Sequence, residues 1–244
     1  MDHLDEVEDA RRRLLIKMLA ASMFAGASAT ESAQAEGVFG SVPEKLPPGR
    51  SIFRLEGSVE VNGKPATPAT QIAPNDTVKT GKQSTLIFVV GGHSILLRSD
   101  SHLVMEATDQ QANPIIQALR LITGKILSVS RDTRYTVRTP TATIGIRGTG
   151  IYAEADAEQT YFCTCYGSTE VSASRDAASK ETVVSKHHDK PLYILGSEPQ
   201  GKNIRSAPFI NHTDQELMLI EALVGRTPPF VFPDKNYAAP RRRY

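Results

Sequence analysis

Short runs of apolar residues, separated by turn-forming residues, follow one another along most of the chain after residue 50. Residues 52–61 alternate between apolar and polar side chains and end at Asn62-Gly63, a strong signal for a two-residue hairpin turn. Residues 85–90 are continuously apolar, which is typical of a buried strand. Further short strands are predicted at residues 93–98, 102–106, 115–122, 125–130, 135–139, 151–154, 160–166 and 169–172, with Gly124 dividing two of them. This regular spacing predicts an all-β fold, an antiparallel β-sandwich or roll.

A segment near the C-terminus follows the helical period instead. Residues 213–224 begin with a Thr-x-x-Glu capping box and have one apolar face. That face consists of Leu217, Ile220, Leu223 and Val224. Gly225 and Pro228-Pro229 end the pattern. The sequence therefore predicts a short C-terminal helix within an extension, residues 176–244, that ends in a Pro/Arg-rich tail.

The first 35 residues have the pattern of an export signal. Arg11-Arg12-Arg13 precede a short apolar run, and Ala33-Gln34-Ala35 is a small-residue cleavage pattern. The uninterrupted apolar stretch, residues 18–29, is shorter than the roughly 20 residues that a membrane-spanning helix needs. We therefore expect a cleaved signal and a periplasmic protein, with an uncleaved inner-membrane anchor as the alternative. Residues 36–50, rich in Pro and Gly, are expected to form an extended linker.

The type of export signal stays open at this point. Residues 12–17 read Arg-Arg-Leu-Leu-Ile-Lys, which resembles a twin-arginine signal. Arg11 stands where that pattern usually has Ser or Thr. A general secretory signal that happens to contain three arginines explains the same residues.

Composition narrows the function classes. A formal net charge of +1 argues against a nucleic-acid binder that works by bulk basic charge. Aromatic residues are 6% of the chain and Trp is absent, so a stacking platform for bases or sugars is not expected. The sequence contains no Walker loop, nucleophile-elbow motif or zincin motif, and no spacing of residues that argues for a catalytic pair. We therefore expect no enzymatic activity.

Several motifs in residues 51–175 occur together in a recognisable order. They are Gly57-Ser58-Val59, residues 76–81, Ser84, Gly91-Gly92 and, most specific, residues 137–149, which read Val-Arg-Thr-Pro-Thr-Ala-Thr-Ile-Gly-Ile-Arg-Gly-Thr. Over about residues 50–175 the chain resembles the FecR-domain family of bacterial exported proteins. The resemblance implies a periplasmic all-β domain, which in envelope regulators relays a signal from an outer-membrane receptor to a cytoplasmic segment that binds a sigma factor. Only about ten residues precede the export signal, so we expect the domain and its compartment without that cytoplasmic segment.

The most specific motif has mainly structural explanations. Thr139-Pro140 favours an extended entry to a strand, because Pro fixes its own φ and biases the preceding residue. Gly148, followed by Thr149, indicates a turn or bulge. Arg147 is expected to keep the fold by bonding carbonyls or a carboxylate of another strand, with ligand binding as the alternative.

Cys163 and Cys165 are the two cysteines of the chain. Two residues apart on a strand, they point to the same face with Cα atoms roughly 6.6–6.8 Å apart. A disulfide prefers about 5.5–6 Å, so a bridge here would be strained. Two thiolates on a tetrahedral metal ion lie roughly 3.7 Å apart, which tilted side chains can reach.

Downstream histidines supply further donors. His187 and His188 precede Asp189, and His212 precedes Asp214 by two residues; a carboxylate beside an imidazole is the pairing that orients a metal-bound histidine. The candidate Cys2His2 set is Cys163, Cys165, His187 or His188, and His212, which suits zinc or copper. A strained or mixed disulfide and inert packing of the cysteines remain alternatives.

The leading expectation is an exported FecR-domain protein that works as a non-enzymatic binding or sensing module through contacts with an envelope protein. Nucleic acid is not expected as a partner, and the membrane only through the N-terminal segment if that segment is uncleaved. The alternative is a metal-binding or thiol-redox protein centred on Cys163 and Cys165.

Overall fold

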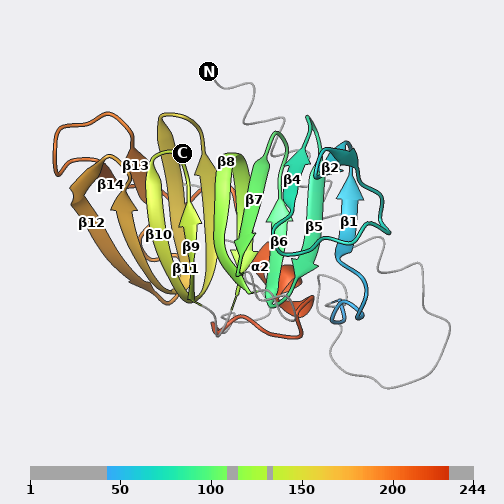
Figure 1. Ribbon diagram of the computed structural model, residues 1–244. Helices are drawn as coiled ribbons and strands as arrows, with labels where there is room; N and C mark the ends of the chain where they lie inside the picture. The colour runs from blue at the N-terminus through green and yellow to red at the C-terminus, as the bar shows by residue number, and fades with distance from the viewer. Residues whose placement is uncertain (1–42, 109–114, 131–133, 231–244) are drawn as a thin grey trace. The chain divides into compact units, whose positions relative to one another are not determined.

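The computed structural model describes residues 43–108, 115–130 and 134–230. The predicted export signal at residues 1–35, part of the 36–50 linker and the end of the Pro/Arg-rich tail lie outside these residues. The described part contains fourteen strands and one helix, which confirms the all-β fold with a short C-terminal helix (Figure 1). Within the same residues no helix is long and apolar enough to span a membrane.

The strands follow the predicted runs closely in the first part of the chain. In chain order the strands are β1 Ile52–Glu56, β2 Val59–Val61, β3 Lys64–Pro65, β4 Thr77–Thr80, β5 Thr85–Val90, β6 His93–Leu97, β7 His102–Ala107, β8 Ile116–Val129, β9 Arg134–Arg138, β10 Ala142–Ala155, β11 Gln159–Ala173, β12 Asp176–Ser185, β13 Leu192–Leu195 and β14 Ile204–Ser206. Asn62 and Gly63 both have positive φ between β2 and β3, as the predicted hairpin turn requires.

The strands pair into two layers that share three long strands. The first layer runs β3, β2, β4, β7, the start of β8, β9, the start of β10, the end of β11 and β12. The second layer runs β1, β5, β6, the end of β8, the end of β10, the start of β11, β13 and β14. Neighbouring strands are antiparallel except β8 and β9, which are parallel. The strands β8, β10 and β11 therefore each cross from one layer to the other.

Each crossing strand has a glycine of positive φ where it changes layer. These are Gly124 (φ 98°), Gly148 (φ 58°) and Gly167 (φ 92°). A Cβ added at Gly167 would lie 2.5 Å from the Cγ2 atom of Thr149, so the close approach of the strands also requires glycine. The sequence pattern predicts a break between two strands at Gly124, and the structure instead has the single strand β8, which bends there. Likewise, the strands predicted at 160–166 and 169–172 are one strand, β11.

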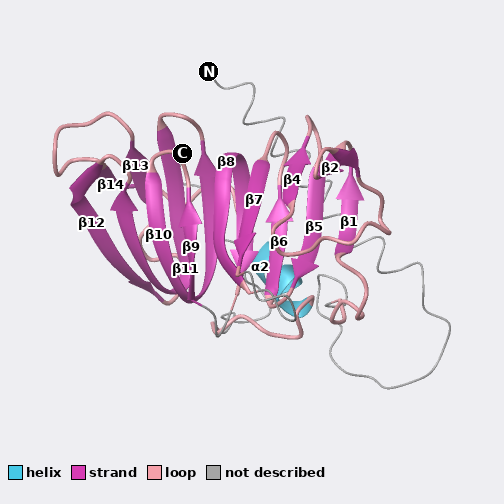
Figure 2. Cartoon of the chain, viewed as in Figure 1, coloured by secondary structure: helices cyan, strands magenta, loops and turns pink. Residues whose placement is uncertain are grey.

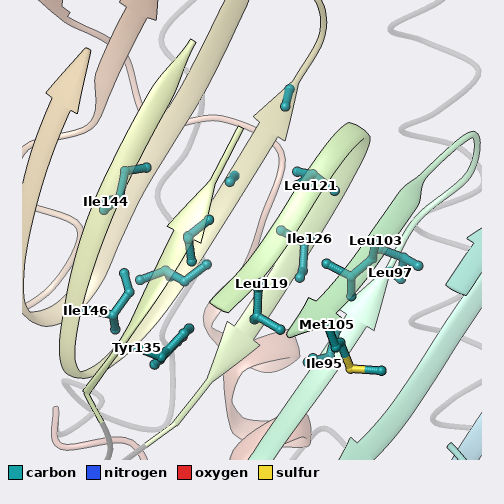
Figure 3. Close-up of a cluster of buried hydrophobic side chains, with 14 of the residues drawn as sticks. Ile95, Leu97, Leu103, Met105, Leu119, Leu121, Ile126, Tyr135, Ile144 and Ile146 are labelled. Carbon is teal, nitrogen blue, oxygen red and sulfur yellow. The ribbon is translucent and has the colours of Figure 1, made fainter. Parts of the chain in front are cut away.

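The main core lies between the two layers. It includes Ile95 and Ile126 from the second layer together with Leu103, Leu119 and Ile144 from the first, all of them fully buried or nearly so (Figure 3). In the second layer, apolar residues that pair across neighbouring strands form what we term the inner row. The inner row consists of Leu86, Leu97, Ile126, Ala153, Phe162 and Leu192.

The second layer also buries its opposite face. The neighbouring residues of the same strands form the outer row, which consists of Ile87, Leu96, Leu127, Tyr152 and Cys163, each 0% exposed. Helix α2 (Asp214–Ala222) contacts β6 and β8 (Figure 2). The capping box predicted at its start, between Thr213 and Glu216, is present. Residues 207–226, termed here the C-terminal cover, thus lie over the outer row.

The region after residue 175 extends both layers. The hydrophobic pattern predicts no strand there, yet β12 pairs with β11 in the first layer. The strands β13 and β14 continue the second layer beyond β11. These strands carry the chain to the C-terminal cover.

Candidate functional site

Four side chains with sulfur or nitrogen donor atoms meet beside the outer row. Cys163 and Cys165 come from β11, His188 from the turn after β12, and His212 from the segment just before α2. One donor atom of each lies within 4.8 Å of the others, and all four residues are buried. The structure thus brings together the two cysteines, His212 and one member of the His187-His188 pair. Both cysteines are free thiols.

The turn after β12 places His188 against β11. The backbone N–H of His188 donates to the carbonyl oxygen of Cys165 at 2.9 Å, and His188 has a φ of 54°. The carboxylate of Asp189 accepts hydrogen bonds from the backbone N–H of Lys186 at 2.7 Å and of His187 at 3.4 Å. Asp189 therefore closes the turn, and it is not the carboxylate that orients an imidazole of the cluster.

The contacts of His212 select its tautomer. Its Nδ1 atom lies 2.7 Å from the carbonyl oxygen of Ile210, which can only accept, so Nδ1 carries the proton. The Nε2 atom of the neutral ring is then left with a lone pair. The ring stacks on Tyr152, with centroids 4.4 Å apart and planes 18° from parallel. This packing fixes the direction in which the lone pair points.

His188 has the complementary arrangement. Its Nε2 atom lies 3.0 Å from the Oδ1 atom of Asp214, so Nε2 donates to the carboxylate. Its Nδ1 atom faces the cluster, 3.1 Å from Nε2 of His212 and 3.4 Å from Sγ of Cys163. With both rings neutral, two lone pairs would meet at hydrogen-bonding distance. A proton or a cation between the two nitrogens is therefore required.

Asp214 is the carboxylate beside the cluster, but it contacts other histidines than the one that the sequence pairs with it. It is 1% exposed and accepts from Nε2 of both His187 and His188 at 3.0 Å. The sequence pairs Asp214 with its near neighbour His212, whereas the structure pairs it with histidines about 26 residues earlier. Its place at the start of α2 gives an ordinary explanation for a carboxylate, so no sequence signal marks the longer-range contact.

Burial, hydrogen bonds and neighbouring charges shift the pKa values of the two cysteines in opposite directions and raise that of His188. Burial would raise the pKa of Cys163, but hydrogen bonds from Cys165, His188 and His212 hold it well below its usual value. Burial, together with the neighbouring Cys163 sulfur and the charge of Asp214, raises the pKa of Cys165. Burial would lower the pKa of His188, but its contacts with Asp214 and Cys163 raise it to about 9. The pKa shifts of Cys163 and His188 act in the direction that favours the thiolate form of Cys163 and the imidazolium form of His188.

The side chain of Cys163 contacts that of His188, which in turn contacts Asp214. This series of thiol, imidazole and carboxylate is also found in nucleophilic triads. However, the side chains of Cys163 and Cys165 are both 0% exposed. The rings of Phe209 and Phe230 pack on His188, with centroids 4.5 and 6.4 Å from the imidazole. Because the cluster is closed, the arrangement suits ion binding better than attack on a substrate.

Buried polar contacts hold the C-terminal cover on the sheet. The guanidinium of Arg98 pairs with the carboxylate of Glu216 at 2.9 Å, and the two side chains are 10% and 2% exposed. Glu221, fully buried, accepts from the hydroxyl of Tyr166 and from Nε of Arg226. These contacts fasten α2 itself, and Arg98 also donates to the carbonyl oxygen of Asn211 at 3.0 Å, next to His212 of the cluster.

The motif residues predicted from the sequence lie in two places, the turn before β10 and the point where β10 changes layer. The Thr139 hydroxyl lies 2.7 Å from that of Thr160, and exposed Pro140 is in the turn between β9 and β10. The register of β10 against β11 shifts between Arg147 and Gly150, so Gly148 and the buried Thr149 lie in a bulge. Arg147 pairs with the Glu170 carboxylate at 2.8 Å, both side chains more than half exposed.

Comparison with known proteins identifies the family of one segment. The family model described as FecR protein matches residues 76–170, which confirms the resemblance over those residues. This segment includes both cysteines, whereas His188 and His212 follow it. No curated protein matches the chain.

Two crystal structures of a protein from Parabacteroides distasonis ATCC 8503, provisionally described as an anti-sigma factor, are similar to this chain. Each has a TM-score of 0.42 and 14% sequence identity. One alignment covers 54% of this chain and 58% of the other, and the second covers 67% and 83%. The chain thus spans little more than half the length of the first of these relatives.

Proposed function

We propose that this chain, which carries a FecR domain at residues 76–170, is an exported, non-enzymatic module of the bacterial envelope that acts by binding another protein. The family match carries the proposal. The closed cysteine-histidine cluster supports the absence of catalysis, because no side chain in it is open to a substrate. The export pattern of residues 1–35 supports a periplasmic location.

The partner in this proposal is a protein of the bacterial envelope. The formal net charge of +1 gives no general attraction to nucleic acid or to an anionic membrane surface. Contact with the membrane is limited to residues 1–35, and only where they remain uncleaved. The role is regulatory, as an element that senses a signal and passes it on through this contact.

Location and partner can be tested together in the native host. The full chain with a C-terminal tag should fractionate with periplasmic proteins, and a chain lacking residues 1–35 should stay in the cytoplasm. Replacing Arg12 and Arg13 by Lys separates the two export routes, because only the twin-arginine route depends on that pair. Full export of the shortened chain would contradict the proposed signal.

The partner is tested by cross-linking in intact cells followed by purification of the tagged chain. A true partner should be recovered in a saturable manner, and excess untagged, folded protein should compete it away. Heat-unfolded protein at the same concentration is the matched control and should not compete. Recovery that neither saturates nor responds to competition would overturn a role in protein binding.

A further inference from the structure

We infer that Cys163, Cys165, His188 and His212 form a four-coordinate binding site for Zn²⁺. The inference goes beyond the protein-binding role and does not depend on it. It rests on three observations: the geometry of the donor atoms, the direction of their lone pairs and the groups that orient them.

The donor atoms are spaced almost as a tetrahedral zinc site needs. Zinc–sulfur bonds of about 2.3 Å and zinc–nitrogen bonds of about 2.0–2.1 Å put the donors of one ion roughly 3.3–3.8 Å from each other. The observed separations are 3.1 Å between the nitrogens of His212 and His188 and 3.4 Å from His188 to the Cys163 sulfur. All the others are at most 4.8 Å. Side-chain rotations that move the donor atoms by about one ångström or less would bring the larger separations to the values of a zinc site.

The lone pairs of the two nitrogen donors face each other inside the cluster, beside the two sulfurs. The Nδ1 proton of His212 is committed to Ile210, and the Nε2 proton of His188 is committed to Asp214. The remaining nitrogens therefore face each other and the two sulfurs, an arrangement that is unfavourable without positive charge between them. Zn²⁺ places positive charge between the two nitrogens, and its charge is balanced by the two thiolates.

Groups around the four ligands orient them as metal sites require. A ligand histidine usually donates its other N–H to a carboxylate or a backbone carbonyl. His188 has the carboxylate of Asp214 and His212 has the carbonyl of Ile210. The backbone bond from His188 to the Cys165 carbonyl fixes the turn beside the cysteines. Both kinds of orienting contact are therefore present before an ion binds.

The donor set distinguishes among metals. Two thiolates and two imidazoles in a tetrahedral arrangement favour Zn²⁺, whereas Mg²⁺ and Ca²⁺ prefer oxygen donors. The protein fills all four positions, so the site is closed in the manner of structural zinc sites and has no position for a reacting water. Two of the ligands, Cys163 and Cys165, belong to β11, and His212 belongs to the C-terminal cover. The ion would therefore join the cover to the sheet.

Direct metal uptake tests the site. The full chain, reduced and treated with a chelator, should take up a single Zn²⁺ per chain and release protons as it does so. Co²⁺ bound in its place should give the visible absorption of a tetrahedral complex and the near-ultraviolet absorption of thiolate ligation. Binding of neither ion to the folded wild-type protein would overturn the site. Uptake of copper(I) without Zn²⁺ or Co²⁺ would overturn the assignment to zinc.

Variants separate ligands from neighbours. Cys165→Ala and His212→Gln should lose tight Zn²⁺ binding and change the Co²⁺ spectrum. Asp214→Asn should weaken Zn²⁺ binding by about 10–100-fold, as loss of an orienting carboxylate does. His187→Gln is the matched control, because His187 contacts the same carboxylate but lies outside the four donors, and its affinity should stay within threefold of wild type.

The thiol state and the fold are checked in the same samples. Circular dichroism identifies any variant that fails to fold, and in that case the uptake by the wild-type protein decides the question. A Cys163–Cys165 disulfide in protein isolated from the periplasm would overturn the site, since oxidised sulfur cannot serve as a thiolate ligand. A wild-type chain that retains its partner but binds no zinc would refute this inference alone. A wild-type chain that binds zinc but retains no partner would refute only the proposed protein-binding role.

Discussion

The two faces of the second layer are built from neighbouring residues of the same strands, yet they are buried by different means. The inner row lies against the apolar residues of the first layer and belongs to the main core. The outer row lies under the C-terminal cover, which brings the buried carboxylates of Asp214 and Glu216 and the imidazole of His212 with it; Arg98, from the sheet side, pairs with Glu216. Among the described residues, buried Asp, Glu and Arg side chains occur chiefly where a late segment of the chain, rather than a sheet, completes the packing.

Two faces that are equally buried therefore need not depend equally on charge. A residue of the inner row is stabilised by apolar contact alone, so its removal should act alike at any pH and salt concentration. Contacts under the C-terminal cover depend on matched charges in a dry environment, which are costly to leave unpaired. Four substitutions test this difference, beginning with the largest expected effect.

Phe162→Ala should cause the greatest loss of stability. Phe162 is 1% exposed on the inner row, and truncation of a buried Phe costs about 4 kcal/mol through lost apolar contact and the cavity left behind. Urea unfolding, followed by circular dichroism, measures the change. Ile126→Val, which removes a single methyl group from the same row, is the control and should cost about 1 kcal/mol. A loss below about 1 kcal/mol for Phe162→Ala would contradict the assignment of this row to the core.

Glu216→Gln should destabilise the protein by about 3 kcal/mol, because the guanidinium of Arg98 is then left buried beside a neutral amide. The substitution preserves the size of the side chain, so the loss reports on charge rather than on packing. Protease digestion should find its first new cleavage in the C-terminal cover. If cleavage and stability both match wild type, buried charge does not hold the cover in place.

His93→Leu should make the folding stability of the protein less sensitive to acid. Burial, with a smaller contribution from the charge of Arg226, lowers the pKa of His93 to about 4, and its ring faces that of Tyr135 at 4.8 Å. The unfolded chain takes up this proton near pH 6.5, so folding stability falls as the pH drops from about 6.5 towards 4. Between pH 7.5 and pH 5 the wild type should lose about 2 kcal/mol more than the variant. Parallel stability curves for the two proteins would refute this.

Arg147→Ala should have the smallest effect, at most about 0.5 kcal/mol, because its ion pair with Glu170 is exposed to water. This pair is the matched control for Arg98–Glu216, with the same types of charged group and a similar distance but different burial. Thermal unfolding at low and high salt measures both pairs. A loss of several kcal/mol at Arg147 would mean that the motif arginine has a role beyond this contact.

The sequence predicts the strands that are built on apolar runs and misses strands that are held mainly by pairing, for physical reasons. Apolar runs such as residues 85–90 determine burial locally, so their strands are found from periodicity. In β12, Asp176–Ser185, most residues are polar, and the strand is held by pairing with β11 rather than by an apolar pattern. The sequence predicts a boundary between two strands at Gly124, because a glycine of positive φ is found both in turns between strands and in bends within one strand.

The donor cluster was predicted as a set of residue types, and its details depended on the fold. Cys163 and Cys165 share a face on any strand, so their proximity follows from the sequence alone. The choice of His188 over His187 depends on the turn in which His188 has positive φ. The role of Asp214 depends on where α2 begins relative to that turn, a separation that no local pattern encodes.

The hydrogen bond between the two ends of the described chain has a mechanical consequence. The backbone N–H of Leu46 donates to the carbonyl oxygen of Leu223, at 3.0 Å, just after the last turn of α2. Tension applied to the chain before residue 46 would therefore load the end of this helix before it loaded the first strand, which begins at Ile52. The segment before β1 is thus connected mechanically to the C-terminal cover. Pulling on this segment would detach the cover and expose the outer row, while the inner row stays buried between the two layers.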